Sequence, residues 1–529
     1  MLDLADPIQH GFESLVPPLV AILLAIATRQ VVFPLAAGVF AGAVLLARAN
    51  PEKSLLDSFA IFAGAIDSSL RDFDHLQTLA FTLLLGAMVG VMEMGGGIAA
   101  LIAKLSRWIR SRRSAQAMIS LSGLAIFFDD YANTLLIGGT MRSTADRYGL
   151  SRAKLAYLVD STAAPVAGLS LVSTWAAIEI SYMSEGLADA GITTPSAGFT
   201  LFIQSIPYRF YPILAIVMVF LISITGRDFA SMKRAEETPR ELAADSAAAS
   251  KETTTTYPPR LWLAAVLSIV ACVAALGTTL VVTGWPAEPS TTSNGVLQDT
   301  IEILGNGKSY LALILGGAVG LATAWLTHAI FGNCDLKTLA MGTLRGGWQM
   351  MPAMIILWLA WALSGMTGED ALQTGDYLSS LLSDRLDPRA LPTVVFALAG
   401  FVAFSTGTSW GTMAILTPLS VTLSLDLAPS GGPGGAICLA TTGSVLAGAI
   451  FGDHCSPISD TTVLSSRACG CDHLQHVRTQ MPYAITVALV CVAMGSIPAV
   501  LGVSPWICLI MGTVALAVIV RFVGKHPTP

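Results

Sequence analysis

Apolar stretches as long as a bilayer is thick recur along almost the whole chain. Hydrophobic residues make up 53% of its 529 residues, and charged residues only 12%. A helix of about twenty apolar residues crosses the hydrocarbon core, and lipid offers no partner to an unpaired backbone group. We therefore predict an all-α polytopic membrane protein with about 12 transmembrane helices.

Two of these apolar stretches carry the same interruption, a proline inside a polar patch. Pro165 lies in the patch 161–173 and Pro457 in the patch 453–465. A single proline of this kind is more often a structural kink, because neighbouring helices re-satisfy the backbone. Repetition in matching polar contexts instead favours the substrate site of a secondary transporter. We predict broken helices at 154–182 and 435–466.

Lysine and arginine counts predict two re-entrant hairpins. The loops 104–113 and 142–154 hold five and four basic residues, so both are expected on the cytoplasmic side. The apolar segment 115–141 between them cannot cross the membrane once, and we predict that it enters and returns.

The count of basic residues also predicts a hairpin at 390–421. The loops 367–389 and 422–434 contain few basic residues and are expected outside. The segment 390–421 between them is then a second hairpin that enters from the opposite face. Opposite entry is typical of inverted-topology repeats.

These elements group into two repeats of opposite orientation. The predicted organisation is an extra N-terminal helix at 1–30, a first repeat at 31–225, a cytoplasmic linker at 226–259, a second repeat at 260–503, and an extra C-terminal helix and tail at 504–529. We expect a multi-pass protein of the cell inner membrane with both termini cytoplasmic.

Acidic residues within the apolar segments indicate mobile cations. A carboxylate at the bilayer centre costs roughly 2.5 to 3.5 kcal/mol, so each needs a partner, a cavity or a function. Hardly any lysine or arginine lies in these segments to neutralise them. Na⁺ takes oxygen ligands, which carboxylates, hydroxyls and freed backbone carbonyls supply. The acidic residues concerned are Asp129, Asp130, Asp160, Glu179, Asp453 and Asp460.

Structural interpretations of the same residues remain open. Asp160 and Glu179 lie near the predicted ends of their span, where they would face water. Asp130 is either an ion ligand or an N-cap at the start of a half-helix. Two adjacent carboxylates there would make exchange of H⁺ for a metal ion natural. His454 is either a proton relay or a hydrogen-bonded packing residue.

Other function classes receive less support from the sequence. The net charge is −6, and no basic stripe with interleaved aromatic residues occurs, which argues against a nucleic-acid partner. No nucleophile, base and orienting residue stand at a recognisable spacing, which argues against an enzyme. The cysteine and histidine residues at 469–476 lack a second Cys-x-x-Cys half, so zinc is a weak interpretation. We expect no bound cofactor.

Four motifs together resemble the NhaC-type Na⁺/H⁺ antiporter family. They are the segments 128–134, 160–165, 405–412 and 452–460. The resemblance implies membership of a wider ion-transporter superfamily with two hairpins and two broken helices in a moving transport domain, usually within a homodimer. Related families also include malate/lactate exchangers and amino-acid carriers.

We therefore expect an antiporter that exchanges Na⁺ for H⁺ by alternating, elevator-like access. The runner-up is a Na⁺- or H⁺-coupled carrier of a small organic carboxylate or amino acid, which Trp175, Trp410 and the hydroxyl-rich tip 404–412 favour. Predicted Na⁺ ligands are Asp453, Ser456, Ser459 and Asp460, and predicted proton-coupling residues are Asp130, Asp453, His454 and Asp460. The full expected ion or substrate site is Asp129, Asp130, Asn133, Thr134, Asp160, Ser161, Thr162, Ser405, Thr408, Asp453, Ser456, Ser459, Asp460 and Thr461.

Overall fold

The protein folds into helices throughout the part of the chain that the structure describes. The computed structural model describes residues 11–28, 30–194, 196–237, 257–285, 303, 307–332, 334–368, 370–382 and 386–527. Within them, extended pairing is limited to one isolated bridge between Asp228 and Lys525. The prediction of an all-α membrane protein is confirmed.

The described part of the chain holds nearly as many candidate spans as the sequence predicts. Among the described residues, ten helices are long and apolar enough to cross a membrane, or eleven if a bent pair at 197–225 forms one span. The predicted span at 55–70 forms a helix of only 15 residues. The exact number of transmembrane helices stays a prediction.

The described helices of the first half run to residue 237. Their bounds are α1 Val16–Thr28, α2 Val32–Ala49, α3 Asp57–Arg71, α4 Phe73–Met94, α5 Gly97–Ser106, α6 Arg112–Ala125, α7 Asp130–Thr140, α8 Arg142–Arg147, α9 Arg152–Ala167, α10 Thr174–Asp189, α11 Ala197–Ser205, α12 Phe210–Thr225 and α13 Ala230–Glu237.

The described helices of the second half begin at residue 261. Their bounds are α15 Leu261–Gly284, α17 Ser309–Gly332, α18 Leu336–Gln349, α19 Met351–Thr367, α20 Thr374–Leu382, α21 Leu391–Thr406, α22 Ser409–Leu427, α23 Ala436–Cys455, α24 Asp460–Cys469, α25 His473–Val490, α26 Ile497–Val500 and α27 Pro505–Phe522.

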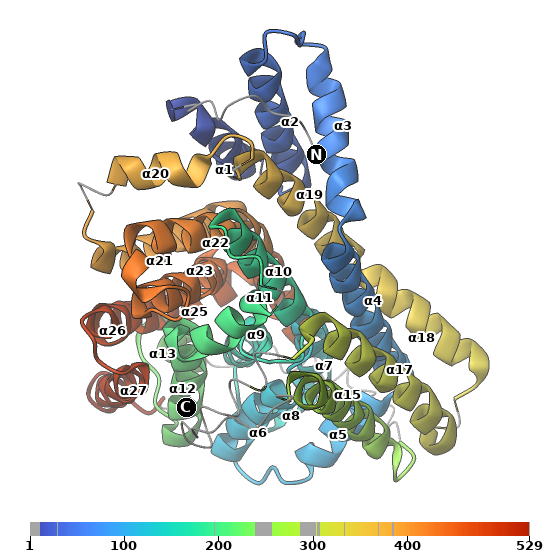
Figure 1. Ribbon diagram of the computed structural model, residues 1–529. Helices are drawn as coiled ribbons and strands as arrows, with labels where there is room; N and C mark the ends of the chain where they lie inside the picture. The colour runs from blue at the N-terminus through green and yellow to red at the C-terminus, as the bar shows by residue number, and fades with distance from the viewer. Residues whose placement is uncertain are drawn as a thin grey trace.

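Helices from both halves mix in two packed groups (Figure 1). The outer group is α1 to α4, α15 and α17 to α19, which pack mainly on one another. The inner group is α6, α7, α9 to α12 and α21 to α25. Within the inner group, α10 packs on α22, and α24 packs on both α7 and α9. The two halves of the chain therefore interlock.

Glycine permits the close contact between α4 and α18 in the outer group. A Cβ atom on Gly90 would lie 2.2 Å from the carbonyl oxygen of Gly342, and one on Gly86 would lie 2.8 Å from that of Gly346. The two glycine pairs are each spaced four residues apart, the small-residue spacing that lets membrane helices approach closely.

Several basic loops gather at one face of the molecule. The Tyr148 hydroxyl donates to the Ile109 carbonyl at 2.9 Å, which joins the loops 104–113 and 142–154. Arg227 donates to the carbonyls of Arg521 and Gly524 at 2.7 and 2.9 Å. Their meeting agrees with the prediction that 104–113 and 142–154 share one side.

The predicted linker 226–259 begins as ordered structure. Its first residues include α13, and the Glu236 carboxylate accepts a hydrogen bond from the backbone amide of Ser151 at 2.7 Å. Residues 226–237 dock on both halves, because α13 packs on α25 as well as on α9. The stretch 238–256 lies outside the described residues.

Residues 11–15, which precede α1, lie beside another loop of the second half. The Thr374 hydroxyl donates to the Ser14 carbonyl at 2.7 Å, beside the loop that the sequence predicts outside. Lys525, near the other end, pairs with Asp228 at the basic face. The cytoplasmic location of both termini stays a prediction, and residues 1–10 are outside the described part.

Candidate functional site

Both predicted broken helices are interrupted. The first stops at Ala167 and resumes at Thr174, and the second stops at Cys455 and resumes at Asp460. Pro165 sits inside the last turn of α9, whereas residue 457 lies within the second break itself. The two prolines therefore act at slightly different points of similar interruptions.

Both predicted hairpins are helix–turn–helix units. Residues 126–129 separate α6 from α7, and Gly407 and Thr408 separate α21 from α22. Gly407 has φ of +73°, and a Cβ atom there would lie 2.5 Å from the Ile458 carbonyl oxygen. Only glycine fits this turn. The re-entrant course of each unit remains a prediction.

Every half-helix that starts at one of these four interruptions carries its own side-chain cap. Asp129 accepts from the Ala132 amide at 2.7 Å, and Ser173 accepts from the Ala176 amide at 3.0 Å. Thr408 and Ser459 do the same for the amides three residues on, at 3.4 and 3.1 Å. These caps satisfy amides that a helix start leaves unpaired. The N-cap of α7 is Asp129 and not Asp130.

Each hairpin turn is tied to the break in its own half by the same kind of bond. The Thr174 amide donates to the Phe128 carbonyl at 2.9 Å, and the Asp460 amide donates to the Gly407 carbonyl at 3.3 Å. Contacts also cross between halves. The Tyr131 hydroxyl donates to the Asp460 carboxylate at 2.6 Å. Four helix starts thereby meet in one place.

Three carboxylates converge at this meeting point. Asp130 and Asp453 are 1% and 0% exposed, whereas Asp460 is exposed. Asp460 lies close enough to each of the other two for their charges to interact. Both oxygens of Asp130 and one of Asp453 have no hydrogen-bond partner in the described part of the molecule. We call Asp130, Asp453 and Asp460 the acidic cluster.

Hydroxyl groups surround the acidic cluster. The Thr461 hydroxyl donates to the second oxygen of Asp453 and lies 3.0 Å from the Ser459 hydroxyl. Ser456 donates to the Phe404 carbonyl at 2.7 Å and thus ties the second break to its hairpin. The predicted Na⁺ ligands therefore lie together; they are Asp453, Ser456, Ser459 and Asp460. Both serine hydroxyls already form hydrogen bonds with backbone groups.

Asp160 belongs to a neighbouring polar network. Its carboxylate accepts from the Gln480 amide at 2.6 Å and from the Thr462 hydroxyl at 3.3 Å. Gln480 also donates to the carbonyl of His454 at 3.0 Å. The His454 ring itself lies 3.0 Å from the Tyr211 hydroxyl, on the side of α12.

The remaining predicted site residues have mainly local contacts. Asn133 donates to the carbonyls of Gly123, Ile126 and Thr162 at 2.8, 3.0 and 3.2 Å, so it clamps the end of α6 against α9. The Thr162 hydroxyl donates within its own helix. Ser161 and Thr134 are buried, and Ser405 is half-buried in the last turn of α21.

Glu179 is not stranded, which corrects the expectation of unneutralised acids for this residue. Its carboxylate lies 2.6 Å from the Arg209 guanidinium, and both side chains are buried. Arg209 also donates to the Gly168 carbonyl at the end of α9. Asp228 is similarly paired with buried Lys154. Among the described residues, no lysine or arginine makes an ion pair with the acidic cluster.

Several contributors at or near the acidic cluster were not singled out from the sequence. Tyr131 lies inside the 128–134 motif, which could have suggested it. Gln480 and His476 carry no such signal, because their partners come from another helix. Trp175 and Trp410, by contrast, are named in the sequence analysis as favouring the carrier alternative; their rings are 5.1 Å apart and join the first break to the second hairpin.

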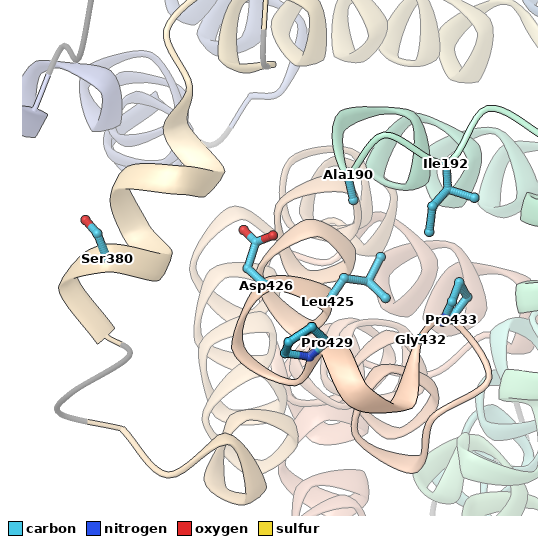
Figure 2. A pocket seen from close by; sticks show the side chains of 8 residues that line it. All are labelled: Ala190, Ile192, Ser380, Leu425, Asp426, Pro429, Gly432 and Pro433. Carbon is cyan, nitrogen blue, oxygen red and sulfur yellow. The ribbon is translucent and has the colours of Figure 1, made fainter.

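A separate hollow opens at the far ends of α10 and α22 (Figure 2). It measures about 600 Å³ and is lined by Ala190, Ile192, Ser380, Leu425, Asp426, Pro429, Gly432 and Pro433. Asp426 stands near the opposite end of α22 from Ser409, roughly 25 Å away at the rise of a helix. The hollow therefore does not contain the acidic cluster.

Comparison with known proteins identifies a family and a fold. The model of a family described as the Na⁺/H⁺ antiporter family matches residues 166–497. An uncharacterised protein of Haemophilus influenzae is 33% identical over 492 residues, which cover 92% of this chain and 91% of that protein. A Malate-2H⁺/Na⁺-lactate antiporter of Bacillus subtilis is 28% identical over 199 residues, or 34% of this chain and 40% of that protein.

A solved structure shares the fold. The YdaH transporter of Alcanivorax borkumensis matches with a TM-score of 0.58 at 14% sequence identity, and the match covers 95% of this chain and 98% of that one. At this identity the likeness concerns the fold alone.

Proposed function

The chain belongs to the Na⁺/H⁺ antiporter family, and on this premise we propose that it exchanges Na⁺ for H⁺ across the cell inner membrane. It is a multi-pass membrane protein and a secondary transporter, not an enzyme. The single observation that carries the proposal is the acidic cluster, because its carboxylates have no fixed cation partner in the described part of the chain.

Charge balance explains why such a cluster would exchange ions. A carboxylate kept from water needs a proton or a cation to offset the cost of its burial. The unpartnered oxygens of Asp130 and Asp453 and the exposed carboxylate of Asp460 are the oxygen ligands that Na⁺ prefers. When Na⁺ arrives, protons leave, so the two ions compete for one place.

Transport follows when this place opens to each face in turn. We place the Na⁺ ligands on Asp453 and Asp460, with Thr461 and Asp130 beside them and the hydroxyls of Ser405 and Thr408 closing the site. The inner group of helices would shift against the outer group in an elevator-like movement. Two inverted-topology repeats and a homodimer complete the proposal, both on the resemblance of the motifs.

Purified protein in proteoliposomes tests the proposal. Vesicles with an acidic interior and a pH-sensitive dye should lose the pH gradient when Na⁺ is added outside, because each entering Na⁺ releases protons outward. Choline added in place of Na⁺ is the control and should change nothing. No response to Na⁺ in active protein would contradict the proposal.

A second candidate is a coupled carrier of a small carboxylate. It is favoured by the buried side chains of Trp175 and Trp410, which lie at the starts of α10 and α22 where an anion is stabilised. The indole N–H of Trp410 has no hydrogen-bond partner in the described part of the chain. The Bacillus subtilis relative is described as a malate and lactate antiporter. A pH gradient that responds to Na⁺ only after malate or lactate is supplied would support this candidate over simple ion exchange.

A further inference from the structure

A continuous line of hydrogen bonds leads from the start of α25 to Asp160. His473 and His476 each place Nδ1 near the Ser466 hydroxyl, at 3.1 and 2.9 Å. Nε2 of His476 then lies 3.0 Å from the Gln480 side-chain oxygen, and the Gln480 amide donates to Asp160. His473 is half-buried, whereas His476 and Asp160 are 0% and 1% exposed. The line therefore runs from an accessible residue to a fully buried one.

The direction of these bonds fixes the Nε2 protons. Gln480 points its nitrogen at two acceptors, Asp160 and the His454 carbonyl, so its oxygen faces His476. His476 must then donate from Nε2. Nε2 of His473 lies 2.6 Å from the Pro457 carbonyl, which only accepts, so it donates as well. A neutral form of either histidine leaves its Nδ1 as an acceptor.

Ser466 cannot satisfy two neutral histidines. Its hydroxyl has one proton and already lies 2.6 Å from the Thr462 carbonyl. With both rings neutral, three acceptors compete for that proton. With both rings protonated, the hydroxyl donates to Thr462 and accepts from both histidines, and every contact is satisfied. Proton occupancy of the pair is therefore coupled to the hydrogen bonds that hold it.

Groups from the neighbouring helices complete the surroundings of His476. Asp160 on α9 faces it at 3.9 Å, His454 on α23 lies close enough for charge interaction, and Thr462 and Ser466 come from α24. Asp160 in turn interacts electrostatically with both Asp453 and Asp460. A proton delivered to Asp160 would remove a negative charge beside the acidic cluster.

We propose that His473, Ser466 and His476 form a path for the coupled proton, distinct from the Na⁺ ligands, that ends on Asp160. The transfer starts with His473 protonated and His476 neutral. His476 gives its Nε2 proton to Asp160 as Gln480 swings aside, and Nδ1 of His476 takes the proton of the Ser466 hydroxyl. Ser466 takes its replacement from Nδ1 of His473. The net change is one proton moved from His473, which becomes neutral, to Asp160, with no change of electrons. This proposal rests on the proposed Na⁺/H⁺ exchange.

A pair of adjacent serines provides a matched test. Ser465 and Ser466 are both buried and both donate to the Thr462 carbonyl, but only Ser466 contacts the histidines. Ser466→Ala should lower Na⁺ flux driven by a pH gradient by about tenfold or more, the scale of losing a positioned proton-transfer group. Exchange of labelled for unlabelled Na⁺ at equal pH moves no net proton and should stay near wild type. Ser465→Ala should leave both rates unchanged.

His473→Gln provides a second variant, at a half-buried position. It should show the same selective loss and a changed pH profile of gradient-driven flux. Loss of both kinds of flux in Ser466→Ala and His473→Gln would overturn the path, since it would indicate a structural role. Unchanged gradient-driven flux in both would also overturn it. Absence of Na⁺-linked proton movement in the wild type would instead refute the proposed function.

Discussion

The acidic side chains at the two interrupted helices have different kinds of partner. At the α9–α10 interruption, the buried Glu179 is neutralised by Arg209, which also binds the carbonyl that ends α9. At the α23–α24 interruption, Asp453 and Asp460 have hydroxyl neighbours, and no lysine or arginine among the described residues pairs with them. The comparison separates a buried acid that has a fixed counter-charge from acids that have none in the described part of the chain, and the second kind is where we propose that the transported ion binds.

We expect the largest effect on transport from a substitution at the α23–α24 interruption. Asp453→Asn should reduce Na⁺-driven proton release by about 100-fold, because it removes a charged group worth roughly 3 kcal/mol. The rate of gradient loss in proteoliposomes measures this. The variant should elute as a single species in detergent, like the wild type. Near-normal exchange in such a well-folded variant would break the comparison.

At the α9–α10 interruption, we expect substitutions to lower the stability of the protein and to leave transport largely intact. Arg209→Gln leaves Glu179 buried without its cation and should destabilise the protein by roughly 3 to 5 kcal/mol. Adding Glu179→Gln should recover most of this loss, because no uncompensated charge remains. Thermal unfolding in detergent measures both variants. The double variant should still exchange Na⁺, and a loss as deep as that of Asp453→Asn would show that both interruptions handle ions.

The smallest expected effect sharpens the role of Tyr131. Tyr131→Phe removes one hydrogen bond to the charged form of Asp460, worth roughly 1 kcal/mol, so the half-saturating Na⁺ concentration should rise about fivefold. Initial rates over a range of Na⁺ concentrations measure this shift. Tyr148→Phe is the matched control, because that hydroxyl bonds a carbonyl in the basic loops. Equal shifts in both variants would contradict a local role at the cluster.

Local patterns in the sequence predicted much of this arrangement. The polar interruptions, the glycine turn at 407 and the Asp-rich motif at 128–134 all mark places where a helix starts or stops, and such signals act within a few residues. Partnerships across the fold carry no comparable signal. Glu179 and Arg209 are thirty positions apart in the sequence, and Gln480 reaches Asp160 from a different half of the chain.

The caps on the four half-helices have a mechanical consequence. At each of these helix starts, a side chain from the preceding turn accepts a hydrogen bond from an unpaired backbone amide. This bond does not depend on which neighbouring helix lies alongside. In the elevator-like movement that we propose, the inner group of helices would therefore keep these hydrogen bonds while it moves past the outer group. The bound cation would then keep the same ligands throughout the movement, and only the side from which water reaches the site would change.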